Sequence, residues 1–333
     1  MRSVFLGDSG SIHTVFSEDI RKTLESEAGL DLATVYKLED LKSSGTCLKN
    51  TQFVFSTWGM PNMNVEDVRE FFPKLEAVFY AAGSVQHFVK PLLQCGVRVF
   101  SAWAANAVPV AEFTLAQILL AGKRYFSCSA IYSNGDFSGA RKVADGITGN
   151  YNSTVGIIGA GMIGKMVIKR LAWHDINVMV FDPFLSDDEA LRLGVAKTSL
   201  QTLFSSCGIV SNHLANNAAT VGMLNYELFS CMPAGGTFIN TGRGAQIVED
   251  DLCRALTERP DLTALLDVTF PEPPAQSHSF FSLPNILLSP HIAGSAGKEV
   301  IRMAQYMLEE YRRVAADEPC LYEVTQSMLE VMA

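Results

Sequence analysis

The stretch "TVGIIGAGMIGKMVIKRL" (154–171) sets three glycines between an apolar run and a segment with helical spacing of apolar residues. An apolar strand that passes through a glycine turn into a helix is typical of the site that binds the pyrophosphate of a dinucleotide. Gly159 permits the tight turn, Gly161 lets a phosphate approach the backbone, and Gly164 allows the helix to pack closely on the strand. The stretch therefore predicts a Rossmann-type α/β domain.

The residues around this turn complete a predicted nucleotide site. Met162 and Ile163 stand at the helix start, where free backbone N–H groups face the phosphates. The next apolar run, "INVMVFD", ends in Asp182, 18 residues after Gly164, which is close to the spacing of an acid that binds the ribose hydroxyls. Such an acid repels a 2′-phosphate, so it favours NAD over NADP. In the alternative interpretation, Asp182 only caps a turn before Pro183.

Apolar runs and helical segments alternate in two sets along the chain. The second set begins at 154, and the predicted strands of the first set lie at 3–7, 52–57, 75–83 and 97–102. Such alternation predicts parallel sheets with helices on both faces. We expect two Rossmann-like or flavodoxin-like parallel-sheet domains with an active-site cleft between them. Residues 1–104 with 296–333 are expected to form the substrate domain, and residues 105–295 the NAD-binding domain.

Three further segments link these sets. The stretch 108–125 is a predicted amphipathic helix with Pro109 in its first turn, where a missing N–H is tolerated. Its apolar part carries Glu112 and is too short for a membrane span. Residues 132–153 form a polar, glycine-rich connection, and the last predicted helix, 296–316, is expected to cross back to the first domain.

Length and composition indicate the class of protein. The chain has 333 residues, a net charge of −9 and a pI near 5.2, with 48% hydrophobic and 18% charged residues. These values are typical of a globular protein of two domains, and the negative charge disfavours nucleic acid or an anionic membrane as a partner. Seven cysteines without a CxxC pair predict free thiols in a cytoplasmic protein and no metal site.

Three later strand ends supply groups that suit acid–base chemistry and anion binding. Arg243 follows one apolar run, Asp267 and Glu272 follow the next, and His291 follows the last. In doubly wound sheets ligands bind at the carboxyl ends of the strands, so these groups can converge. A guanidinium binds a carboxylate bidentately, a histidine donates a proton near neutral pH, and a carboxylate on its other nitrogen orients the ring.

Each of these residues also has a structural interpretation when it is taken alone. Arg243 can pair with a surface acid, Glu272 lies in a proline-rich loop, and an isolated histidine such as His291 is more often structural. Together, after a dinucleotide fingerprint, they favour an enzyme site in which Arg243 can bind a carboxylate.

With these motifs the chain resembles a known family, the D-2-hydroxyacid dehydrogenases, from about Leu75 to the last helix. The motifs that carry the resemblance are "GAGMIG" (159–164), "NTGRG" (240–244), "LDVTFPEPP" (266–274) and "SPHIAG" (289–294). The resemblance implies NAD as the cofactor and catalytic roles for Arg243, Glu272 and His291. It also suggests a homodimer.

The resemblance assigns the remaining site residues as well. Asp267 takes the place of the aspartate that binds the nicotinamide, and Thr241 and His213 fall among the cofactor-binding residues. The segment "YAAGSV" resembles the loop that holds the substrate carboxylate through backbone N–H groups, here at Ala82 and Gly83.

Several positions depart from the family pattern. Gly242 stands where alanine is usual, Val85 where aspartate is common, Trp103 where proline is common and Phe137 where tryptophan is usual, and "HLANNAAT" (213–220) replaces a proline-threonine loop. None of these changes removes a catalytic group. They therefore bear on the substrate and not on the reaction.

The predicted reaction is hydride transfer between NADH and a 2-oxo acid, which gives a D-2-hydroxy acid. Arg243 binds and polarises the substrate, His291 gives the proton to the developing alkoxide, Glu272 keeps His291 charged, and Asp267 orients the nicotinamide. The alternative from another class is a dinucleotide-sensing binding protein like the corepressor members of the same family. A methyltransferase is a more distant alternative, and it leaves the three reactive groups without a role.

The sequence leaves the substrate open. Trp58, Met60 and Trp103 either line an apolar pocket or belong to the core. Turnover of NADH with a panel of 2-oxo acids distinguishes the enzyme from the binding protein and also identifies the substrate.

Overall fold

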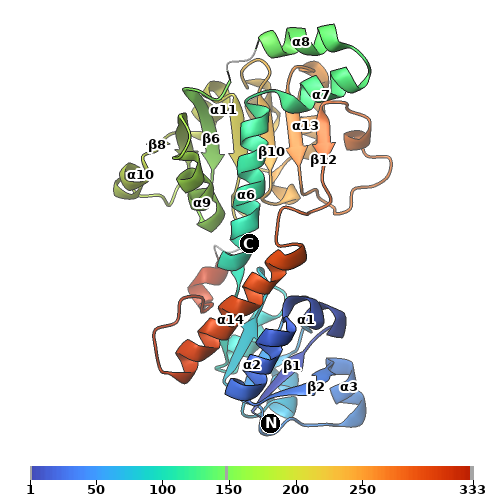
Figure 1. Cartoon of the computed structure of the whole chain (residues 1–333), viewed down its shortest axis with the longest axis vertical. Coiled ribbons are helices and arrows are strands. Elements are labelled where there is room, and N and C mark those ends of the chain that lie inside the picture. The colour runs from blue at the N-terminus through green and yellow to red at the C-terminus, as the bar shows by residue number, and fades with distance from the viewer. Residues whose placement is uncertain (1, 147–148, 331–333) are drawn as a thin grey trace. The chain divides into compact units, whose positions relative to one another are not determined.

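The structure is a computed structural model that describes residues 2–146 and 149–330. It divides into two compact units: unit 1 comprises Met1–Asn106 with Ser295–Ala333, and unit 2 comprises Ala107–Gly294. Each unit is built on one parallel sheet with helices packed against it (Figure 1). The predicted fold class, two parallel-sheet α/β domains, is confirmed.

Unit 1 contains a five-stranded parallel sheet in the order β2-β1-β3-β4-β5. Its strands are β1 (Ser3–Leu6), β2 (Leu30–Tyr36), β3 (Phe53–Ser56), β4 (Ala77–Tyr80) and β5 (Arg98–Ser101). Successive side chains of a strand point to opposite faces, so Val4 packs in one hydrophobic core and Phe5 in another. Burial on both faces explains why β1, β3 and β4 are continuous apolar runs.

Helices cover both faces of the unit 1 sheet. They are α1 (Ser9–Val15), α2 (Glu18–Ala28), α3 (Leu38–Ser44), α4 (Val65–Phe71), α5 (Val89–Gln94) and α14 (Val300–Ala315). Helices α1, α2 and α14 contribute to the core that contains Phe5, whereas α3, α4 and α5 contribute to the core that contains Val4. The last helix of the chain therefore packs within unit 1.

Unit 2 contains a seven-stranded parallel sheet in the order β12-β11-β10-β9-β6-β7-β8. Its strands are β6 (Ser153–Ile158), β7 (Ile176–Phe181), β8 (Ala196–Lys197), β9 (Ile209–Asn212), β10 (Thr237–Asn240), β11 (Thr263–Leu266) and β12 (Ile286–Leu288). The strand order reverses between β6 and β9. Ligands of such sheets bind beyond the carboxyl ends of the strands at this reversal, so the loops after β6 and β9 are the first place to look for a site.

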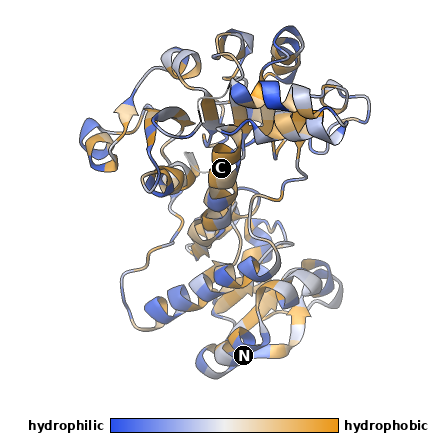
Figure 2. Cartoon of the chain, turned by 45° about the horizontal axis from the view of Figure 1, so that its top comes forward, coloured by the Kyte–Doolittle hydropathy of each residue, from blue (hydrophilic) through white to orange (hydrophobic). Residues whose placement is uncertain are grey.

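Unit 2 has eight described α-helices, six of which divide between the two faces of its sheet. They are α6 (Trp103–Ala121), α7 (Tyr125–Ser133), α8 (Phe137–Asp145), α9 (Met162–Leu171), α10 (Asp187–Leu193), α11 (Leu200–Ser206), α12 (Tyr226–Ser230) and α13 (Glu249–Glu258). Residues of α6, α9 and α10 share one core, and residues of α11, α12 and α13 share the other, while α7 and α8 contact each other. Figure 2 shows hydrophilic residues on the outward parts of the helices and hydrophobic ones along α6.

Local capping signals define several helix ends. Side chains that accept a backbone N–H of the first turn stand at Asp8, Ser17, Asn64, Asp136, Ser186, Ser199 and Asn225. Glycines in the left-handed conformation end α2, α3 and α10 at Gly29, Gly45 and Gly194.

The predicted polar connection at 132–153 is wrong, because most of it is helical. Helix α7 runs through Ser133 and α8 begins at Phe137, after Asp136 accepts the N–H of Gly139. Gly135 separates the two short helices, Gly139 lies inside α8 and Gly146 ends it. Ile147 and Thr148 lie outside the described residues.

Helix α6 also differs from the prediction, because it begins at Trp103 and places Pro109 in its interior. The small buried side chains of Ala104, Ala105 and Ala107 allow the helix to start early against its neighbours. Among the described residues, α6 is the one helix whose length and composition would suit a membrane span, and about half of it is buried inside the protein. A core helix of a soluble protein meets the same criteria, so this finding is weak evidence for a membrane.

Strand β2 was not anticipated. Its burial pattern is mixed along Leu30–Tyr36, and it lies at one edge of its sheet. An edge strand that faces solvent lacks the continuous apolar run of the central strands, so composition alone does not reveal it.

Candidate active site

The loop after β6 requires glycine at two positions for steric reasons and leaves the third open. Gly159 has φ +89°, and a Cβ added to it would lie 2.8 Å from the carbonyl oxygen of His213. A Cβ on Gly164 would lie 2.0 Å from the carbonyl oxygen of Gly159, because α9 packs directly on this turn. A Cβ on Gly161 meets no heavy atom within 4 Å. This is the arrangement expected of a loop that leaves its backbone accessible to a phosphate.

Met162 and Ile163 form the first turn of the ten-residue helix α9, after Gly161 as its N-cap. The N-terminal amides of this helix are not capped by a side chain, since Gly161 has none. They are therefore suited to receive a phosphate group.

Asp182 follows β7 and holds two segments in place. One carboxylate oxygen accepts the N–H of Ala160 at 2.6 Å, and the other accepts the N–H groups of Phe184 at 2.7 Å and Leu185 at 3.1 Å. The turn-capping interpretation is therefore correct as far as it goes. The same carboxylate also lies directly beside the glycine loop, so its role in ribose binding stays a prediction.

His213 and Thr241 lie at the ends of β9 and β10, and both are buried. The Nε2 atom of His213 lies 3.0 Å from the Ser211 hydroxyl, while its Nδ1 has no hydrogen-bond partner among the described residues. Burial lowers the pKa of His213 to about 3, so the ring is neutral. The Thr241 hydroxyl lies 3.0 Å from that of Thr114 on α6.

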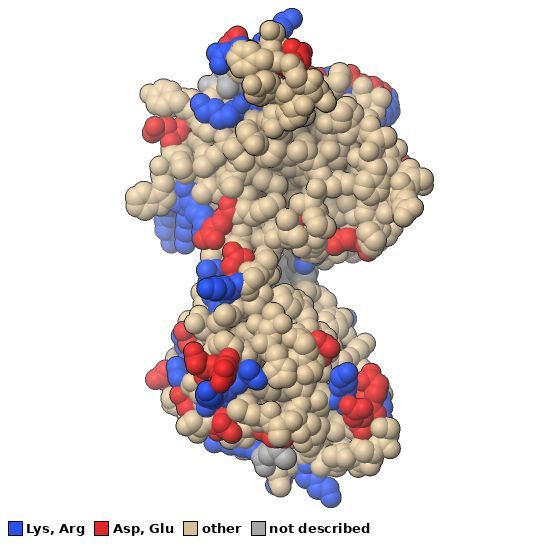
Figure 3. All heavy atoms as spheres, turned by 45° about the vertical axis from the view of Figure 1, so that its right-hand side comes forward, with Lys and Arg blue, Asp and Glu red and all other residues tan. Residues whose placement is uncertain are grey.

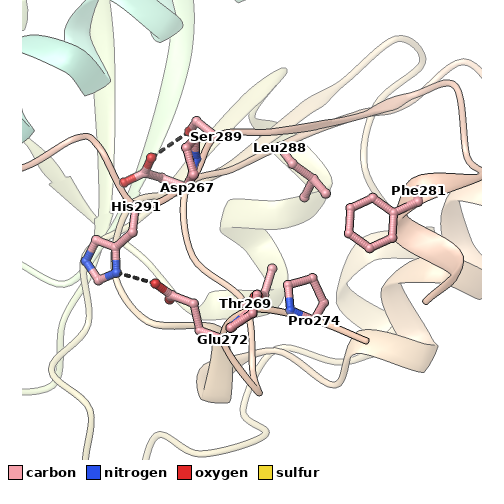
Figure 4. Close-up of a pocket in the computed structure, with 10 residues that line it drawn as sticks. Asp267, Thr269, Glu272, Pro274, Phe281, Leu288, Ser289 and His291 are labelled. Atoms are coloured by element: carbon pink, nitrogen blue, oxygen red, sulfur yellow. Dashed lines mark hydrogen bonds and ion pairs between the residues drawn. The ribbon is translucent and has the colours of Figure 1, made fainter. Parts of the chain in front are cut away.

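Asp267 follows β11 and organises the loop that carries His291. One carboxylate oxygen accepts the Ser289 hydroxyl at 2.6 Å and the N–H of Ile292 at 2.9 Å, and the other accepts the N–H of Ala293 at 2.9 Å. Figure 4 shows this carboxylate beside Ser289, with His291 next to it. Asp267 therefore has a structural role, because it fixes the backbone of the loop that carries His291. Its contact with the nicotinamide stays a prediction.

Glu272 and His291 form a close pair, as the sequence motifs predicted. The Glu272 Oε1 atom lies 2.7 Å from Nδ1 of His291 (Figure 4). The backbone of His291 has φ +54°, a conformation uncommon for a residue other than glycine and often found at functional sites. Since Nδ1 faces Glu272, Nε2 is the nitrogen left to exchange a proton with another molecule.

Arg243 follows β10 and begins a short 3₁₀ turn, Gly244–Gln246. Its guanidinium is half-buried and donates through Nη1 to the carbonyl of Gly242 at 2.8 Å. Burial lowers the pKa of Arg243, and the carboxylate of Glu272 acts in the opposite direction. A guanidinium always carries its charge in proteins, so this half-buried cation near Glu272 is poised to bind an anion.

The glycine after Arg243 has a packing role that the sequence did not show. A Cβ on Gly244 would lie 2.0 Å from the carbonyl carbon of Thr269. The arginine turn therefore lies against the loop that leads to Glu272, and glycine is required at this contact.

A buried amide network beneath Arg243 was also missed by the sequence analysis. Asn212 donates to Asn240 at 3.0 Å and to Gln246 at 2.6 Å, and Gln246 accepts the N–H of Arg243 at 3.2 Å. A signal was present, because the apolar runs of β9 and β10 both end in asparagine. Buried amides of this kind fix a turn when every member is hydrogen-bonded.

A cavity of about 490 Å³ lies beside the Glu272–His291 pair. Its lining includes Thr269, Pro274, Phe281 and Leu288, which Figure 4 shows on the far side of Glu272 from His291. The cavity is mainly apolar, with the paired carboxylate and imidazole at one end.

Ala82 and Gly83 lie in unit 1, at the carboxyl end of β4. The Ser101 hydroxyl donates to both of their carbonyl oxygens, at 2.9 Å and 2.6 Å, which fixes the backbone of this loop. The other predicted site residues lie in unit 2. The structure thus brings Arg243, Glu272, His291 and Asp267 together within one unit, and the substrate role of Ala82 and Gly83 stays a prediction.

The three apolar residues left open by the sequence separate into two groups. Met60 and Trp103 pack in the hydrophobic core of unit 1, whereas Trp58 is 42% exposed. Trp58 is therefore the most exposed of the three. The described residues hold no group of three or more His, Cys, Asp or Glu side chains that could bind a metal ion, and all seven cysteines are free thiols.

Comparison with known proteins gives consistent matches. The family model described as "D-isomer specific 2-hydroxyacid dehydrogenase, NAD binding domain" matches residues 115–293. YoaD of Bacillus subtilis, whose name places it among the 2-hydroxyacid dehydrogenases, is 32% identical over 60% of this chain and 58% of its own length. The D-3-phosphoglycerate dehydrogenase of Archaeoglobus fulgidus is 27% identical over 71% of this chain and 44% of its own. The aligned part spans about half the length of these relatives.

Solved structures share the whole fold. The D-mandelate dehydrogenase of Rhodotorula graminis superposes with a TM-score of 0.82 at 18% identity, covering 100% of this chain and 99% of that one. A phosphoglycerate oxidoreductase of Rhizobium etli gives 0.81 at 21% identity, covering 98% and 99%. At these identities the likeness concerns the fold alone.

Proposed function

Because this chain belongs to the D-isomer-specific 2-hydroxyacid dehydrogenase family, we propose that it is an NAD-dependent oxidoreductase that interconverts a 2-oxo acid and a D-2-hydroxy acid. The observation that carries the proposal is the Glu272–His291 pair, with 2.7 Å between Oε1 and Nδ1, beside the half-buried charge of Arg243. An acid–base pair next to a fixed cation suits a substrate that has both a carboxylate and a reducible carbonyl. The dinucleotide-sensing alternative is not favoured.

The glycine loop and Asp182 support NAD as the cofactor of unit 2. The open space at Gly161 and the uncapped start of α9 fit a pyrophosphate. Asp182 lies beside that loop, where a carboxylate repels the 2′-phosphate of NADP. When bound, NADH supplies the hydride that reduces the carbonyl carbon.

The chain's own residues perform the remaining steps. Arg243 binds the substrate carboxylate and draws electron density toward the carbonyl oxygen. His291 gives the proton on Nε2 to the developing alkoxide, while Glu272 on Nδ1 stabilises the imidazolium and fixes the ring. Asp267 keeps the loop of His291 in place and helps to orient the nicotinamide. Ala82 and Gly83 hold the substrate carboxylate through backbone N–H groups.

The direct test is NADH oxidation, followed at the nicotinamide absorbance band, with glyoxylate, pyruvate, hydroxypyruvate and branched and aromatic 2-oxo acids. We expect turnover with at least one member and a D-2-hydroxy acid as the product. Absence of turnover across the panel, with NADH bound, would contradict the enzyme proposal and leave a dinucleotide-binding protein.

We further propose that the protein is a cytoplasmic homodimer without nucleic-acid or membrane partners. Helix α7 has no buried residue although it is rich in apolar ones, and Tyr125, Tyr132 and Phe137 on the α7–α8 pair are 51%, 58% and 60% exposed. Such a patch is typical of a protein interface. On the face drawn in Figure 3, acidic and basic side chains are interspersed, which does not favour a polyanion.

The oligomeric state can be measured by light scattering after gel filtration. Phe137→Glu is expected to shift the protein from dimer to monomer, while Phe184→Glu, at an 84% exposed site outside the α7–α8 pair, leaves the mass unchanged. A monomeric parent protein would contradict the homodimer proposal.

A further inference from the structure

The loop that carries Glu272 is closed by a second, more deeply buried acid. Glu249, the first residue of α13, accepts the N–H of Phe270 through Oε1 at 2.8 Å. Its other oxygen, Oε2, lies 3.2 Å from Nε2 of His278. One carboxylate therefore holds both ends of the segment 270–278, and Glu272 lies within that segment.

The hydrogen bonds define which nitrogen of His278 carries a proton. Nδ1 accepts the N–H of Phe280 at 3.2 Å, so it must present a lone pair. Nε2 therefore carries the ring proton and faces the Glu249 carboxylate, 3.2 Å from Oε2. The His278 ring also packs against the ring of Phe280, with 4.3 Å between centroids. The backbone N–H of His278 donates to the carbonyl oxygen of Ala275 at 2.8 Å. The ring is thus fixed on every side that the structure describes.

Burial distinguishes this pair from the pair that it supports. The side chains of Glu249 and His278 are 11% and 20% exposed, whereas those of Glu272 and His291 are 41% and 47% exposed. Burial raises the pKa of Glu249, and the Phe270 amide and His278 act in the opposite direction. An exposed ion pair has little intrinsic ability to hold two side chains in one geometry. The geometry of Glu272 must therefore come from its backbone.

Glu249 also connects the loop of Glu272 to the segment of Arg243. Helix α13 begins five residues after Gly244, and Gly244 lies against Thr269 just before Phe270. We propose that Glu249 and His278 are positioning residues for the reaction: they fix the 270–278 segment and thereby hold the Glu272 carboxylate on Nδ1 of His291. This inference rests on the proposed function.

The test is Glu249→Gln. The glutamine oxygen can still accept the Phe270 N–H, but its amide group presents N–H donors to the Nε2–H of His278, so one end of the segment is released. A displacement of about 1 Å at a catalytic group can lower the rate about 100-fold. We expect kcat for 2-oxo acid reduction to fall about 10-fold to 100-fold, with the Kd for NADH unchanged within about twofold.

Asp250→Asn is the matched control, because Asp250 is the exposed neighbour in the same first turn of α13. It removes the same charge from the same helix end and is expected to leave kcat unchanged. If Asp250→Asn slows the reaction as much as Glu249→Gln does, the effect comes from helix charge and the proposal is wrong.

A double-variant cycle separates positioning from general destabilisation. If Glu249 acts through Glu272, the variant with both Glu249→Gln and Glu272→Gln is expected to be no slower than Glu272→Gln alone. Losses that multiply in the double variant would overturn the proposal.

A readout without turnover keeps this inference distinct from the proposed function. Nitrogen NMR of the histidine rings reports whether Nδ1 of His291 is hydrogen-bonded. We expect that signature in the parent protein and in Asp250→Asn, and its loss in Glu249→Gln. If the signature persists in Glu249→Gln, the positioning role is wrong. If it is lost but the parent protein turns over no 2-oxo acid, the proposed function is wrong instead.

Discussion

The two halves of the unit 2 site are held by different means. The glycine loop after β6 is limited mainly by close packing of backbone atoms, since Gly164 lies against the carbonyl of Gly159 and Gly159 lies against that of His213. The Glu272–His291 pair is exposed and is held by groups distant in sequence, such as Asp267 and Glu249. Steric limits at glycines thus largely define the nucleotide loop, whereas hydrogen bonds to the flanking segments define the acid–base pair. Variants in the two regions should therefore fail in different ways.

The largest effect is expected from His291→Asn. The variant keeps a polar side chain but cannot donate a proton near neutral pH, and general acid catalysis contributes roughly 100-fold to 10,000-fold. We expect kcat/KM for reduction to fall about 1,000-fold while the Kd for NADH measured by fluorescence stays near that of the parent. If NADH binding weakened as much as kcat/KM fell, the acid–base pair and the nucleotide loop would not be independent parts of the site.

The next effect concerns two glycines of the nucleotide loop. Gly164→Ala forces a methyl group onto the carbonyl of Gly159, so the free energy of unfolding should fall by about 2–4 kcal/mol. Gly161→Ala meets open space, so stability should change by less than about 0.5 kcal/mol while NADH binding weakens. Urea unfolding measures the free energy of unfolding of both variants, and NADH titration measures their Kd. Equal losses of stability in Gly161→Ala and Gly164→Ala would show that close packing at Gly164 does not define the loop.

A smaller, pH-dependent effect is expected from His213. Its pKa is lowered to about 3 by burial, whereas an unfolded histidine titrates near 6.5. As the pH falls, His213 takes up a proton in the unfolded chain before it does so in the folded protein. Its contribution to the free energy of unfolding is therefore present above pH 6.5 and is lost as the pH falls toward 3. The slope is at most about 1.4 kcal/mol per pH unit.

Acid unfolding followed by circular dichroism measures this term. His213→Gln is expected to flatten the loss of stability between pH 6.5 and 4 relative to the parent, while His174→Gln, at an exposed position, leaves the slope unchanged. The same slope in all three proteins would mean that another group titrates in this range.

The smallest effect is expected from Asp182→Ala. Its carboxylate holds the N–H of Ala160 and is predicted to bind the ribose, so the Kd for NADH should rise about 10-fold, which is the value of one or two hydrogen bonds to a charged group. The Kd for NADPH should change less, because a repulsion is removed together with the bond. Calorimetric titration with both nucleotides provides the comparison, and a parent protein that binds both equally would contradict the ribose assignment.

The contrast between the two regions also explains what the sequence could predict. The glycine loop and the central strands were predictable, because glycine positions and continuous apolar runs are local signals. The positions of Arg243, Glu272 and His291 at strand ends were predictable for the same reason. Strand β2 lies at a sheet edge without such a run. The glycines in and around α7 and α8 gave this segment the composition of a loop, so its helices were not predicted. The roles of Gly244 and Glu249 depend on contacts with Thr269 and Phe270, about 20 to 25 residues away, and no local pattern encodes them.

The kcat/KM for 2-oxo acid reduction in the Glu272→Gln variant tests the central claim most directly. His291 gives its Nε2 proton to the substrate, and the Glu272 carboxylate, 2.7 Å from Nδ1, holds the ring in place for that step. Its neutral amide replacement should therefore lower kcat/KM about 100-fold with the Kd for NADH unchanged, while Glu227→Gln, at an exposed position on α12, leaves both values unchanged. A kcat/KM like that of the parent in Glu272→Gln would show that Glu272 and His291 do not act as an acid–base pair.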